Sequence, residues 1–306
     1  MSRTVFLGTS PFAAVVLDAL ASSPHRPSLV ITPPDRPRGR GRLTLPPPVA
    51  QAAREAGLDL VQTEDVGRGK AVEAIRAADP EIVCLCAFGQ IVREPLLSEF
   101  TILGVHPSLL PRWRGAAPIE RAIMAGDSGT GTCVMRVIEE LDAGPVAACG
   151  SLDIGPEETF GELSARLAEL GSRLLLEVLE RFRRGEIELT PQAARGITYA
   201  EKIEPAERAL DPSEPAEALA RVVRALTPHV GAYLDLGGGA RLGVRSARAD
   251  PVASEPGLLD AEEDEIVLGC GEGSLRIAEV QPPSSRWMDA AAYLRGHRPP
   301  ARVPLR

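Results

Sequence analysis

The first half of the chain alternates short apolar runs with amphipathic helical segments, and this alternation restricts the fold more than any other feature. Apolar runs that predict strands occupy residues 4–7, 28–32, 59–62, 81–87 and 101–106. Helical spacing of apolar residues separates several of these runs, at residues 12–20, 49–56, 70–78 and 118–124. Strands that alternate with helices predict a parallel sheet with helices on both faces, so we expect an α/β fold.

The pattern changes beyond residue 130. Residues 132–137 and 145–152 predict two strands that no helix separates, and residues 159–184 predict one long amphipathic helix. The composition then becomes polar and irregular up to about residue 209, which indicates a linker. These features predict a first domain over residues 1–189 and a linker over residues 190–208.

The last part of the chain lacks strand–helix alternation, which indicates a separate domain over residues 209–306. A helix is predicted over residues 213–226, with Ser213 as its cap and Pro215 near its first turn. Glycine-rich turns then separate strand candidates at residues 232–236, 241–244, 265–268 and 274–280. We expect a small antiparallel barrel or sheet in this domain.

The composition is that of a globular protein, with 44% hydrophobic and 25% charged residues among 306. No apolar run approaches the ~20 residues that a membrane-spanning helix needs. Met1 leads directly into the first strand without a signal-peptide pattern, so we expect a cytoplasmic location. The net charge of −8 argues against nonspecific coating of nucleic acid but allows a local basic patch.

The five cysteines predict core thiols rather than a metal site. Cys84 and Cys86 lie two residues apart in an apolar run, which puts both on one face of a buried strand. Cys133, Cys149 and Cys270 are scattered, and no Cys-x-x-Cys or His/Cys cluster indicates zinc. We expect reduced cysteines and no bound metal.

His106 lies where the run at residues 101–106 ends, directly before a turn-rich segment with two prolines, two arginines and a tryptophan. A ligand-binding α/β sheet uses the carboxyl ends of its strands, and a histidine there can move protons near neutral pH. For a lone histidine, a residue that merely ends a strand is the simpler interpretation.

A second candidate, Asp142, lies in the connection between the two strands predicted after residue 130. Taken alone, Asp142 is interpreted as a turn residue, because aspartate bonds its own backbone in turns. Paired with His106, its carboxylate would keep the imidazole protonated and shuttle a proton, as acyl transfer requires.

Two further segments have competing interpretations. Phe88, Gly89 and Gln90 follow a predicted strand, where a flat ring would approach the backbone closely, or where Phe88 simply packs in the core. A loop carries arginines that alternate with proline and glycine, at Arg36, Arg38, Arg40 and Arg42. It is either a solvated surface loop or a phosphate-binding loop. We favour phosphate binding, because an acidic protein gains little solubility from a positive cluster.

Six segments together resemble the methionyl-tRNA formyltransferase family nearly from end to end. The longest runs from His106 to Ile119, with the sequence HPSLLPRWRGAAPI, and a second is LDAGP around Asp142. The others are VFLGTSPFA, PDRPRGRG, TYAEKI, and VQP followed by WM, at residues 5–13, 34–41, 198–203, 280–282 and 287–288. Each piece is short, but the combination is highly specific.

The resemblance implies a Rossmann-like formyltransferase domain with a mostly parallel sheet, followed by a small OB-like β-barrel domain that contacts tRNA. It implies transfer of the formyl group of 10-formyltetrahydrofolate to the α-amino group of initiator methionyl-tRNA, for translation initiation. His106 and Asp142 would be the catalytic pair, and the arginine loop would contact tRNA. The folate would lie against Ser108, Leu109, Leu110 and Pro111, with its pterin beside Phe88, Gly89 and Gln90. We expect a monomer without a membrane partner.

The chain departs from the family pattern at one position. The family carries an asparagine two residues before the histidine, as a donor to the formyl oxygen, and this chain has Gly104 there. Unless an N–H or a water substitutes, the missing donor predicts a rate about a hundredfold lower. One alternative is therefore a catalytically impaired relative that only binds folate or tRNA. Another is a formyltransferase for a small amine, against which the arginine loop and the second domain argue.

Overall fold

The structure is a computed structural model that describes residues 3–38, 43–262 and 264–305. The chain divides into two compact units. The first contains Met1–Gly115, Gly129–Asp153 and Ser164–Tyr199, and the second contains Ala116–Ser128, Ile154–Leu163 and Ala200–Arg306. None of the helices in the described part of the chain has both the length and the apolarity needed to cross a bilayer.

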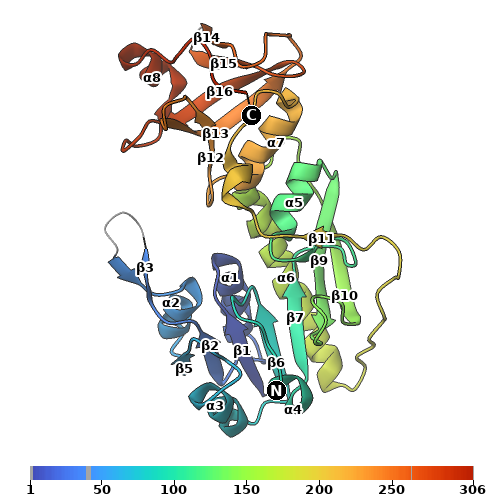
Figure 1. The fold of residues 1–306 in the computed structure, drawn as a ribbon. Helices are drawn as coiled ribbons and strands as arrows, with labels where there is room; N and C mark the ends of the chain where they lie inside the picture. Colours follow the sequence, from blue (N-terminus) through green and yellow to red (C-terminus); the bar gives the residue numbers. More distant parts are fainter. Residues whose placement is uncertain (1–2, 39–42, 263, 306) are drawn as a thin grey trace. The chain divides into compact units, whose positions relative to one another are not determined.

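The first unit is built on a seven-stranded sheet with the order β10-β9-β7-β6-β1-β2-β5 (Figure 1). Its strands are β1 (Thr4–Gly8), β2 (Leu29–Thr32), β5 (Leu60–Gln62), β6 (Ile82–Cys86), β7 (Ile102–His106), β9 (Gly129–Arg136) and β10 (Val146–Asp153). The five neighbouring strands β7, β6, β1, β2 and β5 are parallel to one another. Strand β9 runs antiparallel to β7, and β10 runs antiparallel to β9. The predicted α/β fold with a mostly parallel sheet is confirmed.

Helices cover this sheet: α1 (Pro11–Ala21), α2 (Pro48–Glu55), α3 (Lys70–Ala78), α4 (Leu96–Glu99) and most of α6 (Phe160–Arg183). The Ser10 hydroxyl caps α1 by accepting from Ala13 N at 3.2 Å, which satisfies an amide that the first turn leaves unpaired. Ile75 of α3 is fully buried in one cluster with Val5 and Ile31 of the sheet. Each such side chain contributes about 1.5–3 kcal/mol by leaving water.

The second unit contains a six-stranded antiparallel sheet, with the path β12-β13-β16-β15-β14 and β17 paired to β16. Its strands are β12 (Ala232–Asp235), β13 (Arg241–Asp250), β14 (Leu259–Glu262), β15 (Glu265–Gly269), β16 (Ser274–Gln281) and β17 (Met288–Asp289). Helix α7 (Ala216–Leu226) buries Leu219 and Val223 in one core with Ile277 of β16. Helices α5 (Pro118–Ala125) and α8 (Ala290–Gly296) and the 3-10 helix η1 (Pro205–Arg208) complete the unit.

Two short ribbons were not predicted. One pairs β3 (Arg36–Arg38) with β4 (Leu43–Leu45), and the other pairs β8 (Arg114–Gly115) with β11 (Tyr199–Ala200). Strands of two or three residues carry too little apolar pattern to be recognised in a sequence.

Two predictions are wrong. Helix α7 begins at Ala216 with Pro215 at its N-cap, so Ser213 does not cap it. Ser213 instead donates its N–H to the Asp211 carboxylate at 3.0 Å, in a turn before the helix. Cys133 and Cys149 are not free thiols but are joined by a disulfide, because β9 and β10 place them directly opposite each other.

The other cysteines are free and buried, as expected. Cys84 and Cys86 both lie in the central strand β6 without solvent exposure. Burial raises the pKa of the Cys84 thiol to about 12, so this side chain stays neutral in the core.

Candidate active site

His106 is the last residue of β7, and its imidazole faces two hydrogen-bond acceptors. Nε2 lies 2.8 Å from Trp113 O, and Nδ1 lies 3.5 Å from Asp142 Oδ2. The ring is 8% exposed. A backbone carbonyl and a carboxylate therefore lie at the two ring nitrogens. The structure thus brings together the two side chains that the sequence singled out.

Asp142 reaches His106 by way of a returning connection. The connection, residues 137–145, begins after Arg136, which lies opposite Leu103 near the start of β7, while His106 lies at the other end of that strand. It must therefore fold back along the sheet to bring the carboxylate to the imidazole. Asp142 adopts a left-handed conformation with φ 48°, and its Oδ2 accepts from Gly115 N at 2.8 Å.

The returning connection depends on Gly144. A Cβ added to this glycine would lie 1.7 Å from the carbonyl oxygen of Arg136, so no other residue fits without displacing the backbone. The turn that presents Asp142 is therefore packed directly against the end of β9.

The predicted folate segment, Ser108 to Pro111, divides into a structural and an accessible part. The Ser108 hydroxyl is fully buried and donates to Arg112 O at 2.6 Å, which fixes the loop after β7. Leu109 is exposed, and Leu110 and Pro111 are half-buried, so these three retain surface that a ligand can contact.

The loop after β6 meets the loop after β1, where Gly89 N donates to Thr9 Oγ1 at 3.2 Å. The chain leaves β1 toward β2 on one side and later returns to β6 on the other side, so the strand order reverses at β1. Open α/β sheets bind ligands at the carboxyl ends of the strands beside such a point. Gly89 leaves its backbone exposed there. Phe88 packs partly against the core, and the Gln90 amide bonds Val66 N and Thr63 O at 2.8 and 2.7 Å. The Phe88 and Gln90 side chains thus have structural roles.

The three atoms nearest to the space beside Gly104 are two methyl carbons and a carbonyl oxygen. A Cβ built on this glycine would lie 3.1 Å from Val137 Cγ2, and the other two nearest atoms are Met135 Cε and Met135 O, at 3.8 and 3.9 Å. None of these three atoms is a hydrogen-bond donor. None of the three nearest atoms therefore replaces the amide donor that the resemblance would put at this position.

The predicted arginine loop lies partly on the β3–β4 ribbon. Arg36 pairs with Glu64 at 2.6 Å. Arg40 and Arg42 lie outside the described residues, as does the side chain of Arg38. The structure therefore locates Arg36 alone among the four side chains.

Arg114 and Gln192, which no sequence pattern singled out, border the turn at residues 142–144, here called the Asp142 turn. Arg114 is 5% exposed and bonds Gln192, whose amide in turn bonds the backbone of the turn. Gln192 lies in a polar stretch without periodicity, and no signal in the sequence distinguishes it from a solvated side chain.

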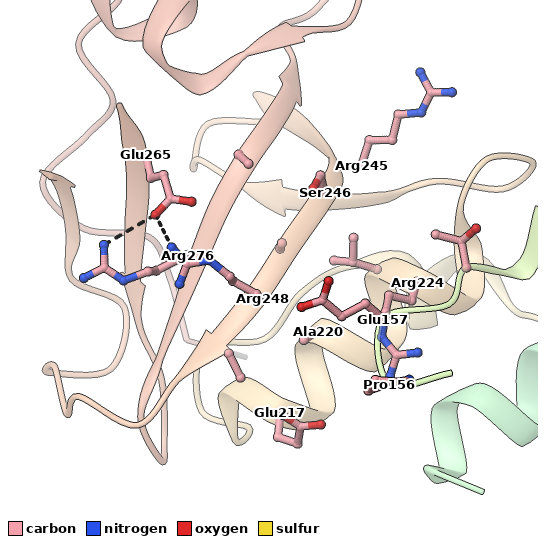
Figure 2. Close-up of a pocket in the computed structure, with 15 residues that line it drawn as sticks. Pro156, Glu157, Glu217, Ala220, Arg224, Arg245, Ser246, Arg248, Glu265 and Arg276 are labelled. Atoms are coloured by element: carbon pink, nitrogen blue, oxygen red, sulfur yellow. Dashed lines mark hydrogen bonds and ion pairs between the residues drawn. The ribbon is translucent and has the colours of Figure 1, made fainter. Parts of the chain in front are cut away.

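A cavity of about 420 Å³ in the second unit contains none of the predicted site residues (Figure 2). Arginines from α7, β13 and β16 project around it. Arg248 and Arg276 bond Glu265 at 2.7 and 3.5 Å, so carboxylates offset much of the positive charge. Burial lowers the pKa of Arg224, which donates to Glu158 O at 3.0 Å. Across residues 3–38, 43–262 and 264–305, no group of three or more metal-ligating side chains is placed to hold an ion.

Comparison with known proteins agrees with this architecture. The family model described as formyl transferase matches residues 2–179, and that of the formyl transferase C-terminal domain matches residues 202–298. Among solved structures, HypX from Aquifex aeolicus in complex with tetrahydrofolic acid has a TM-score of 0.66 at 19% identity, over 96% of this chain and 47% of that one. An N-formyltransferase from Helicobacter canadensis has a TM-score of 0.67 at 14% identity, over 92% of this chain and 100% of that one. At these identities the structures show a shared fold.

Fold and matched models thus define a two-domain formyl transferase. Methionyl-tRNA formyltransferase of Halorhodospira halophila is 45% identical over 304 residues, 97% of each chain. That of Symbiobacterium thermophilum is 41% identical over 303 residues, 97% of this chain and 93% of that one. The chain belongs to the methionyl-tRNA formyltransferase family.

Proposed function

We propose that this protein transfers the formyl group of 10-formyltetrahydrofolate to the α-amino group of initiator methionyl-tRNA, the step that prepares the tRNA for translation initiation in the cytoplasm. The observation that carries the proposal is the 45% identity with a methionyl-tRNA formyltransferase over 97% of both chains. The pair formed by His106 and Asp142 supplies chemistry that fits this reaction.

In the proposed reaction, the neutral amine of the aminoacyl-tRNA attacks the formyl carbon and the carbonyl electrons move to oxygen. The positive charge of the His106 imidazolium, whose two nitrogens face Trp113 O and Asp142, stabilises the resulting oxyanion. Asp142 favours the imidazolium and accepts the amine proton, directly or through a water. The bond between the formyl carbon and the folate nitrogen then breaks, and that nitrogen takes up a proton as tetrahydrofolate leaves.

The two substrates would meet at the loops beside His106. We assign the accessible surface of Leu109, Leu110 and Pro111 and the exposed backbone at Gly89 to folate binding. That HypX is a protein of this fold crystallised with tetrahydrofolic acid supports a folate donor. We assign tRNA binding to the arginine loop, through Arg36, Arg38, Arg40 and Arg42, and to the second unit. We expect the protein to act as a monomer.

The test is transfer of a radiolabelled formyl group from 10-formyltetrahydrofolate to charged initiator tRNA. The proposal predicts acid-precipitable label that depends on enzyme, on donor and on the aminoacyl group. Uncharged tRNA, which has no α-amino group, is the negative control. Amino sugar nucleotides and glycinamide ribonucleotide serve as competing acceptors, and their formylation is followed by the release of tetrahydrofolate. No product above background at high enzyme concentration would refute catalysis, and preference for a small amine would replace the proposed acceptor.

A further inference from the structure

Residues 190–199, here called the strap, are bound to the first unit along the candidate active site. They begin at Thr190, whose backbone exchanges hydrogen bonds of 2.8 and 2.9 Å with Val146 of β10. Within the strap Gln192 and Thr198 are half-buried, and the remaining residues are exposed. Two polar side chains that turn inward from an otherwise exposed segment point to a specific role.

Gln192 binds the backbone of the Asp142 turn with both hydrogens of its amide. Nε2 donates to Asp142 O at 2.7 Å and to Gly144 O at 2.9 Å. These carbonyls lie on either side of Ala143, so the amide spans the turn that presents the carboxylate. Because the connection returns from the far end of β7, these two hydrogen bonds help to hold its position, together with the bond from Gly115 N to Asp142 Oδ2.

Arg114 fixes the orientation of that amide. Its Nε and Nη2 both donate to Gln192 Oε1, at 3.1 and 2.9 Å, and its Nη1 pairs with Glu140 at 3.2 Å. The guanidinium is almost fully buried. A cation holds only the oxygen of an amide, so the NH2 group must face the two carbonyls.

Thr198 connects the same strap to the partner of His106. Its Oγ1 accepts from Trp113 N at 2.9 Å, and Trp113 O is the acceptor for His106 Nε2. Thr198 O also accepts from Arg114 N at 2.9 Å. The strap therefore contacts the supports of both members of the pair.

We propose that Gln192 is a positioning residue for formyl transfer, which holds the Asp142 turn so that the carboxylate stays beside His106. The inference rests on the proposed function and adds to it a residue outside the family motifs described above. A small displacement of a catalytic group costs up to about a hundredfold in rate. Gln192→Ala is thus expected to lower kcat about 10- to 100-fold, with KM for both substrates unchanged.

The decisive experiment is a double-mutant cycle between Gln192→Ala and Asp142→Ala. If Gln192 acts through the carboxylate, adding Gln192→Ala to Asp142→Ala lowers kcat no further, because there is no carboxylate left to position. Gln51→Ala, an exposed glutamine on α2, is the matched control and is expected to leave kcat unchanged in either background.

The outcomes separate the two proposals. A wild-type protein without formyl transfer would refute the proposed function itself. If the wild type is active and Gln192→Ala has the same kcat, the positioning role of Gln192 is refuted and the proposed function stands. The same holds if the two single-variant losses in kcat multiply in the double variant. If Gln192→Ala does not fold, Gln192→Glu replaces it, since glutamate still accepts from Arg114 but cannot donate to the two carbonyls. Full kcat in that variant would equally refute the inference.

Discussion

Gly104 of β7 and Met135 of β9 are cross-strand partners, and the Met135 side chain lies against the space that a residue 104 side chain would enter. Gly104 is two residues before His106 on the same strand, so both positions project to one face of the sheet. The position that the resemblance would fill with an asparagine is thus on the face of the site, bordered by a Val137 methyl group and by the Met135 side chain and carbonyl oxygen.

Gly104→Asn is expected to raise kcat, because it supplies a hydrogen-bond donor on the face of the sheet from which His106 projects. The gain is about 10- to 100-fold if the amide reaches the formyl oxygen. Val137 Cγ2, 3.1 Å from the new Cβ, must give by a few tenths of an ångström, and Val137→Ala relieves that contact. Gly104→Ala is the control, since it adds the Cβ without the amide. Equal kcat for the Asn and Ala variants would mean that no donor is missing.

Replacing either member of the central pair is expected to abolish most of the activity. His106→Ala removes the cation proposed to stabilise the oxyanion and is expected to lower kcat by about 10²- to 10³-fold. Asp142→Asn keeps the shape but removes the charge and the proton acceptor. Asp59→Asn, the same change at an exposed position, is expected to have no effect. Single-turnover formylation rates, with melting temperatures to establish folding, check the prediction; a mutant with more than a tenth of the wild-type rate would contradict it.

The arginine loop is expected to control the salt dependence of tRNA binding. Changing Arg36, Arg38, Arg40 and Arg42 together to Gln removes up to four phosphate contacts, each worth about 0.7–0.9 in the slope of log K against log salt. Filter binding of initiator tRNA between low and physiological salt measures that slope. Arg183 and Arg184, exposed at the end of α6 and beyond it, provide a control pair. An unchanged slope in the loop variant would favour a small amine as the acceptor.

Gly144→Ala is expected to impair both stability and catalysis. Its methyl group would collide with Arg136 O, so the connection that carries Asp142 has to move. Such overpacking costs about 1–3 kcal/mol of stability. Gly296→Ala, where an added Cβ meets nothing within 4 Å, is the control. Urea unfolding and kcat are measured for both variants, and wild-type values for Gly144→Ala would show that the turn adapts freely.

His25 is expected to make the protein less stable in mild acid. Its ring is buried, and burial lowers its pKa below the ordinary 6.5, despite opposition from Glu180 at 3.4 Å. The unfolded chain then binds the extra proton first, so the free energy of unfolding falls as the pH drops below about 6.5. His25→Gln is expected to flatten this decline in urea titrations from pH 8 to pH 5, relative to His297→Gln. An unchanged decline would assign it to other groups.

The sheet and its helices could be predicted because burial leaves a periodic trace in the sequence. The runs around β1, β6 and β7 are apolar on both faces, as strands covered by helices must be. A helix cap depends on which of several local hydrogen bonds a residue makes, and Ser213 bonds Asp211 in a turn before the helix and does not cap it. The disulfide between Cys133 and Cys149 could not be predicted, because it depends on the register of β9 and β10, which the spacing of the cysteines does not determine.

The candidate site was predictable only in part. His106 and Asp142 could be selected by residue type and position, but their distance depends on a connection that folds back. Gln192 could not be selected, since a polar amide in an irregular segment has the same pattern whether it faces water or two carbonyls. The departure at Gly104 is visible in the sequence, but its neighbours Met135 and Val137 depend on strand pairing and on the connection after β9.

His106 and Asp142 of the candidate site are anchored differently. His106 is hydrogen-bonded within the sheet and moves only if the central strands move, whereas Asp142 lies in the loop of residues 137–145. Changes in the length or the hydrogen bonds of that loop can therefore move the Asp142 carboxylate while the sheet beneath it stays intact.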